Sequence, residues 1–170
     1  MRGARALRHQ LVTDQQQDIY DYWLELAGQV DGLPHRRQID PVRIRRQLPF
    51  ISLYKRGTDD RFEVRLAGTG YWNVFGAEIT GRSIDDLPLG EGCRYWNRVL
   101  SHVEATGLPM AGTTAPNTPI GSHLRQFWMR LPLENELILG FDQFLRAPDR
   151  QPSRLMRPVF GTGTPMLATV

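Results

Sequence analysis

The chain has a single cysteine, a single lysine and no long apolar run. Cys93 alone excludes an internal disulfide and a zinc site built from several cysteines. Lys55 lies outside any Gly-x-x-x-x-Gly-Lys motif, which excludes that type of phosphate-binding loop. No apolar run approaches the roughly 18 residues that a membrane helix needs, and no secretory leader follows the first arginines. These absences favour a cytoplasmic protein without an integral membrane segment.

Enzyme motifs are absent as well. Gly68 and Gly70 follow an expected strand, but Asn73 stands where the dinucleotide-binding pattern requires a third glycine. The sequence contains neither His-Glu-x-x-His nor Gly-x-Ser-x-Gly, and its histidines and carboxylates have no metal-ligand spacing. We therefore expect a protein that is not an enzyme, with no catalytic residues and no metal site.

The excess of positive charge lies at the two ends of the chain. The whole chain carries a formal charge of +3, but residues 14–147 carry more acidic than basic side chains. A protein that binds nucleic acid in a groove would place a basic stripe on its folded body. We therefore expect a basic, flexible N-terminus over residues 1–13, one domain over 14–147 and a disordered tail over 148–170, with no nucleic-acid partner.

The first two thirds of the domain alternate between helices and strands. Apolar residues at helical spacing predict a helix over 14–30 and a second long helix over 91–106. A short helical turn is expected over 42–47, before a first strand. The remaining expected elements are strands over 50–54, 61–67, 108–114, 122–133 and 137–145 and a short helix over 71–75.

This order predicts an α+β fold. The five strands would form an antiparallel sheet, with the short helices and one long helix on one face and an N-terminal helix in addition. A sheet cupped in this way by helices is a common place for a ligand pocket.

Short sequence pieces give the chain a family resemblance. In this order and spacing they resemble the PAS fold, and within it the PAS_5 group of alphaproteobacterial proteins, once catalogued as a domain of unknown function. The pieces are Tyr22-Trp23, Leu33-Pro34, Ile39-Asp40-Pro41, Leu48-Pro49, Arg65-Leu66-Ala67-Gly68-Thr69, Phe75-Gly76, Ile79-Thr80-Gly81-Arg82 and Leu131-Pro132-Leu133.

The resemblance implies a sensory or ligand-binding domain that acts in signalling. PAS domains bind small ligands or cofactors, or dimerise, and pass a change to an output module or a signalling partner. The residues leave two alternatives open: an interaction module with a filled core and no ligand, and an adaptor whose basic ends bind nucleic acid or a membrane.

Aromatic and large apolar side chains near the sheet are the candidates for a ligand pocket. A packed core is the competing interpretation, because aromatic side chains bury large areas in any fold. The candidates are Tyr71, Trp72, Phe75, Trp96, Leu100, Phe127, Met129 and Phe141.

Three polar side chains are candidate anchors for a ligand: Arg65, His102 and Arg125. Arg65 could also pair with an acidic neighbour in the fold. In haem-binding PAS domains an axial histidine comes from the long helix, but His102 lies off the apolar face of this helix, so haem is not expected. Cys93 lacks the motif of flavin-binding relatives, so flavin is not expected and the ligand stays unknown.

The apolar stripe on the first helix is wider than a single buried face requires. We therefore expect part of it to pack on a second copy of the chain. The candidates for this homodimer contact are Ile19, Tyr22, Trp23 and Leu26.

Overall fold

The computed structural model describes residues 7–116, 118, 121, 123–146 and 159–160. Its centre is an antiparallel sheet in the order β2-β1-β5-β4-β3-β6. The strands are β1 (Ile51–Arg56), β2 (Phe62–Ala67), β3 (Met110–Thr114), β4 (Leu124–Pro132), β5 (Leu137–Arg146) and the two-residue β6 (Val159–Phe160). The five strands predicted from the sequence are confirmed.

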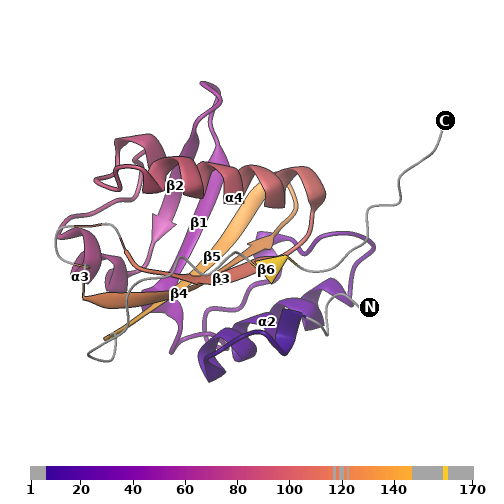
Figure 1. Cartoon of the computed structure of the whole chain (residues 1–170). Coiled ribbons are helices and arrows are strands. Elements are labelled where there is room, and N and C mark those ends of the chain that lie inside the picture. Colours follow the sequence, from indigo (N-terminus) through magenta and orange to yellow (C-terminus); the bar gives the residue numbers. More distant parts are fainter. Residues whose placement is uncertain (1–6, 117, 119–120, 122, 147–158, 161–170) are drawn as a thin grey trace.

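The helices cover both faces of this sheet (Figure 1). The helix α2 (Asp14–Ala27) lies against one face, and α4 (Gly92–Thr106) crosses the other, with α3 (Trp72–Phe75) near one end. Short 3-10 turns connect these elements: η1 (Arg36–Gln38), η2 (Leu48–Phe50), η3 (Thr69–Tyr71) and η4 (Ile84–Asp86). The predicted α+β fold, with short helices and one long helix on one face and an N-terminal helix, is therefore confirmed.

Alternation along the central strands divides the core into two clusters. On β4, Met129 and Leu131 belong to the cluster under α2, whereas Trp128 belongs to the cluster under α4. Because successive side chains of a strand point to opposite faces, Gln126 and Arg130 share the α4 side with Trp128. The α4 side is thus the side that carries the buried charged groups Arg130 and Asp142.

The helix α2 is fixed to the sheet by caps, burial and two hydrogen bonds. Its N-cap Thr13 and its residue Gln16 form a capping box. The Gln16 side chain also donates to the Trp128 carbonyl at 3.3 Å, and the Trp23 indole donates to the Pro132 carbonyl at 2.9 Å. Both bonds go to β4, so α2 is tied to the strand that also faces the α4 side.

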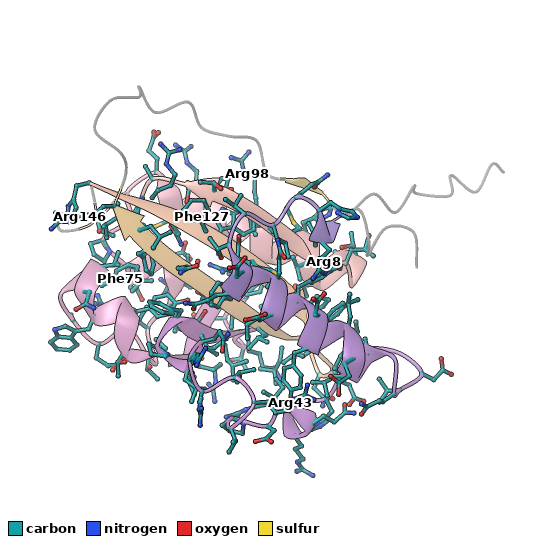
Figure 2. All side chains as sticks on the ribbon, turned by 90° about the horizontal axis from the view of Figure 1, so that it is seen from below. Arg8, Arg43, Phe75, Arg98, Phe127 and Arg146 are labelled. Atoms are coloured by element: carbon teal, nitrogen blue, oxygen red, sulfur yellow. The ribbon has the colours of Figure 1, made fainter. Side chains whose placement is uncertain are left out.

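The residues expected at a dimer contact are buried inside one chain. Ile19, Tyr22, Trp23 and Leu26 are at most 8% exposed and pack on the sheet. These side chains are therefore used in packing within the chain, and a homodimer stays a prediction. The helix α2 has more apolar residues than contact with the sheet alone requires, because the segment before it and the loop after it also pack on it. Figure 2 shows Arg8 and Arg43 beside α2, where they pair with Asp21 and Glu25.

The domain begins earlier than predicted. Leu7 and Leu11 are 1% and 5% exposed and belong to the core cluster under α2, so residues 7–13 are not a flexible extension. The expected short helix over 42–47 is a series of turns. The expected disordered tail over 148–170 lies outside the described residues, except that β6 pairs with β3 at Met110 and Ala111.

Two tryptophans form a matched pair for testing this packing. Trp23 is 7% exposed and hydrogen-bonded to β4, whereas Trp72 is 56% exposed. Trp23→Ala should lower the free energy of unfolding by about 3–5 kcal/mol, because it removes buried area and leaves a cavity. Trp72→Ala should change it by less than about 0.5 kcal/mol. Urea unfolding followed by circular dichroism measures both, and equal effects would contradict the placement of α2.

Candidate functional site

A cavity of about 480 Å³ lies between the sheet and the helices of the α4 side. Its volume falls within the range of small-molecule sites, which is roughly 300–1,000 Å³. Most of its walls are aromatic or aliphatic. The lining includes Tyr54, Val64, Tyr71, Val74, Phe75, Ile79, Ile84, Leu87, Leu89, Tyr95, Trp96, Leu100 and Phe144, with Thr114, Thr118, Gln126 and Arg130 as polar members.

The floor of the cavity rests on a buried ion pair between β4 and β5. Arg130 and Asp142 are 3% and 0% exposed in their side chains. The Arg130 guanidinium donates to both carboxylate oxygens, at 2.9 Å and 3.0 Å. The carboxylate also accepts from the Gln126 amide at 2.6 Å and from the Tyr71 hydroxyl. Asp142 therefore has four donors and stays buried at little cost in unpaired charge.

Aromatic rings enclose the guanidinium of Arg130. Its carbon lies 4.7 Å from the ring centre of Trp96, 5.0 Å from that of Tyr54 and 5.8 Å from that of Trp128. The Arg130 Nε has no hydrogen-bond acceptor among the residues that the structure describes. Attraction between the cation and the ring faces compensates for part of this loss. The arginine thus joins α4, through Trp96, to the sheet.

Burial and neighbouring charge shift the ionisation of this cluster. Burial works against the charge of Arg130, but the Asp142 carboxylate outweighs it, so the pKa of Arg130 is raised above its ordinary value. Burial and then the charge of Asp142 raise the pKa of the Tyr71 hydroxyl well above 10.0. Burial also raises the pKa of Tyr54. At neutral pH the cluster therefore holds one cation, one anion and two neutral phenols.

A glycine on β5 makes room for this cluster. A Cβ atom at Gly140 would meet the Ser52 hydroxyl, would lie 2.7 Å from the Tyr54 ring and would lie 3.2 Å from the Arg130 guanidinium. Gly112 on β3 plays the same part for Trp128, whose ring carbon would lie 2.6 Å from an added Cβ. Glycine at these two positions leaves room for the large side chains of Tyr54, Arg130 and Trp128 to lie against the sheet.

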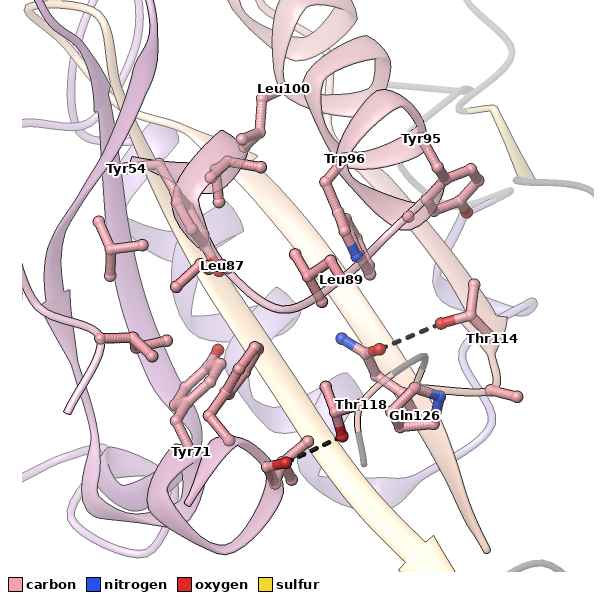
Figure 3. A pocket seen from close by; sticks show the side chains of 18 of the residues that line it. Tyr54, Tyr71, Leu87, Leu89, Tyr95, Trp96, Leu100, Thr114, Thr118 and Gln126 are labelled. Carbon is pink, nitrogen blue, oxygen red and sulfur yellow. Dashed lines mark hydrogen bonds between the residues drawn. The ribbon is translucent and has the colours of Figure 1, made fainter. Parts of the chain in front are cut away.

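Two polar side chains reach the cavity, Gln126 from the sheet and Thr118 from the loop after β3 (Figure 3). The Gln126 amide oxygen accepts from the Thr114 hydroxyl at 3.1 Å, and its nitrogen donates to Asp142. The Thr118 hydroxyl donates to the Val74 carbonyl at 2.9 Å, which ties the loop after β3 to α3. The charged lining residues Glu91 and Arg98 are exposed at the rim. The interior thus carries no uncompensated charge.

Four of the eight predicted pocket residues line this cavity: Tyr71, Phe75, Trp96 and Leu100. The other four lie elsewhere, which corrects the expectation for them. Met129 and Phe141 face α2, because they alternate with Arg130 and Asp142 along their strands. Phe127 is on that same face of β4 (Figure 2), and Trp72 is mostly exposed.

None of the predicted polar anchors lines the cavity. Arg65 pairs with Glu63 at 3.1 Å on the exposed side of β2. Arg125 alternates with Gln126 and so lies on the other face of β4. His102 is on α4 but is not part of the lining, and Cys93 is half-buried, with its thiol 3.4 Å from the Ile84 carbonyl.

Arg130, Asp142 and Gln126 are the polar residues of the site that the sequence analysis missed. A signal for them was present. Arg130 and Asp142 are charged residues inside largely apolar stretches of two expected strands. Successive side chains of such a strand point to opposite faces, and both faces are expected to be buried. A charged residue inside such a run requires a buried partner.

A family model of PAS domains, PAS_5, matches residues 12–140, which is well over half of the chain. The chain belongs to this PAS domain family. Comparison with curated proteins and with solved structures found no match. The resemblance read from the sequence is therefore confirmed, and the cavity described above lies in a PAS domain.

Two further observations concern the part of this PAS domain that the structure describes. No helix there combines the length and the apolar character needed to cross a membrane. No group of three or more histidine, cysteine or acidic side chains is placed to hold a metal ion among those residues.

Substitutions at the ion pair test how it is balanced. Arg130→Met or Asp142→Leu alone should each cost about 3–5 kcal/mol of stability, because each leaves a buried charge unpaired. The double variant should cost much less than the sum, since Tyr71 keeps Ser52 at 2.8 Å and Gln126 keeps Thr114. Denaturant unfolding of the three variants measures this coupling, and additive losses would contradict a mutually compensated pair.

The raised pKa of Tyr71 predicts a loss of stability in alkali. Above pH 10 this tyrosine ionises in the unfolded chain but stays protonated in the fold, so stability falls as pH rises. Burial also raises the pKa of Tyr20 and of Tyr95 to about 12, which adds to the loss. Tyr71→Phe should make the decline shallower by about 1.4 kcal/mol per pH unit. Urea midpoints between pH 9 and pH 12 measure the slopes, and unchanged slopes would contradict the burial of Tyr71.

Proposed function

We propose that this PAS domain is a non-enzymatic sensory module of the cytoplasm, which binds a small molecule in the cavity under α4. Binding would be passed to a signalling partner or to a second copy of the chain. The observation that carries the proposal is the cavity itself, about 480 Å³ and lined mostly by aromatic and aliphatic side chains. An interaction module with a filled core would have no such space.

The connection from the cavity to the opposite face supports a sensory role. Arg130 and Gln126 on the floor alternate along β4 with residues that pack under α2. The carbonyls of Trp128 and Pro132 on this strand accept hydrogen bonds from α2. A ligand that favours one arrangement of β4 would therefore change the position of α2 on the sheet. Such a ligand shifts the equilibrium only by its difference in affinity for the two arrangements.

A cavity-filling variant tests the proposal. Leu89 is 5% exposed and projects into the pocket (Figure 3). Leu89→Trp should fill the space and weaken ligand binding by at least roughly tenfold. Leu145→Trp is the matched control, because Leu145 is 42% exposed on the other face of β5.

The measurement is a thermal-shift screen of a metabolite library, with native mass spectrometry of gently purified protein beside it. We expect compounds that raise the melting temperature of the wild type and of Leu145→Trp but not of Leu89→Trp. If no compound shifts the wild type and no mass excess is found, the proposed ligand-binding function is wrong. Stabilisation that survives Leu89→Trp would place binding outside the cavity.

A further inference from the structure

The amide of Gln126 on the cavity floor is oriented by hydrogen bonds at both of its ends. The side chain is 7% exposed and points into the pocket from β4 (Figure 3). Thr114 donates to its oxygen at 3.1 Å, and its nitrogen donates to Asp142 at 2.6 Å. A flipped amide would place its oxygen against the carboxylate, so the two neighbours fix which end is the donor.

The fixed amide keeps one N–H for a ligand. An amide nitrogen has two hydrogens, and the Asp142 carboxylate takes one of them. Figure 3 shows the nitrogen on the pocket side of the oxygen. The second N–H, which has no acceptor among the described residues, is therefore a donor of known direction in a chamber lined mostly by aromatic and aliphatic side chains, where an unmet donor costs free energy.

Charge around this donor disfavours an ionised ligand group. Arg130 lines the cavity and would repel a cation, whereas Asp142, which lies below the lining next to the amide nitrogen, compensates the charge of Arg130 through two hydrogen bonds and would repel an anion. The two charges compensate each other, so the interior offers no counter-ion. Burying an unpaired charge there would be expensive.

The walls favour a flat molecule. Rings of Tyr54, Tyr71, Trp96 and Phe144 line the chamber, and such rings pack well against the faces and edges of other rings. Tyr71 and Phe144 already meet edge to face at a centroid distance of 5.9 Å.

We propose that Gln126 selects the ligand: an uncharged, flat, largely apolar molecule with one hydrogen-bond acceptor, such as a ketone or amide carbonyl, that takes the free N–H. This inference rests on the proposed ligand-binding function. It assigns Arg130, Asp142 and Thr114 the role of positioning the amide.

Three matched probes test the acceptor. They are 2-acetylnaphthalene, which has a neutral carbonyl, 2-ethylnaphthalene, which lacks an acceptor, and 2-naphthoate, which is charged. Titrations of the full chain are followed by NMR on the indole N–H of Trp96 and the side-chain amide of Gln126. The ketone should bind roughly three- to tenfold more tightly than the hydrocarbon, and the carboxylate should bind most weakly.

Gln126→Met removes the amide at similar volume. Asp142 keeps Arg130 at 3.0 Å in this variant, and Thr114 is partly exposed to water, so the fold should persist. The preference for the ketone over the hydrocarbon should disappear. Gln143→Met is the control, because Gln143 lies on the other face of β5, and it should leave the preference unchanged.

The outcomes separate the two proposals. Equal binding of the three probes, tightest binding of the carboxylate, or a ketone preference that survives Gln126→Met would overturn the role of Gln126 and leave the ligand-binding function standing. Failure of all three probes to bind at millimolar concentration would overturn the role of Gln126. Whether the cavity binds any ligand is then decided by the Leu89→Trp screen.

Discussion

The ion pair between Arg130 and Asp142 is the interaction on which the arrangement of the α4 side depends. Both side chains are almost fully buried, and each alone would be a costly charge inside the fold. Together they hold Tyr71 and Gln126 by hydrogen bonds and Trp96 by a cation–π contact. The pair therefore positions groups from the sheet, from η3 and from α4 around one cavity. Apolar side chains could fill the same volume, but they would not fix the direction of a donor.

The two faces of the sheet have different roles in this PAS domain. The face under α2 is closed by apolar packing, with Phe141 and Met129 fully buried. The face under α4 combines packing with polar groups and open volume. Strand β4 joins them, because its side chains alternate between the cavity floor and the α2 cluster while its carbonyls accept from α2. If the cavity binds a ligand as we propose, this strand would connect the ligand to the opposite surface.

The sequence predicted the elements well and the site only in part. Helical spacing and strand alternation were sufficient for α2, α4 and the five long strands, because those patterns arise from burial on one face. Which face each strand buries was not predictable, so Met129 and Phe141 were assigned to the wrong cluster. Arg130 and Asp142 are far apart in the sequence, and their pairing follows from the register of β4 against β5. The width of the apolar stripe on α2 predicts a dimer contact, but the sequence alone does not show that Leu7 and Leu11 join the same core cluster.

Arg130 is buried and its charge is compensated by Asp142, so we expect its side chain to be held rigidly. NMR of the arginine side chains tests it most directly, with Arg130 assigned by comparison with the Arg130→Met/Asp142→Leu double variant. We expect separate, slowly exchanging Nη signals for Arg130, because bidentate bonds to Asp142 and the surrounding rings restrict rotation of the guanidinium. A single averaged signal that exchanges as fast as those of exposed arginines would contradict it.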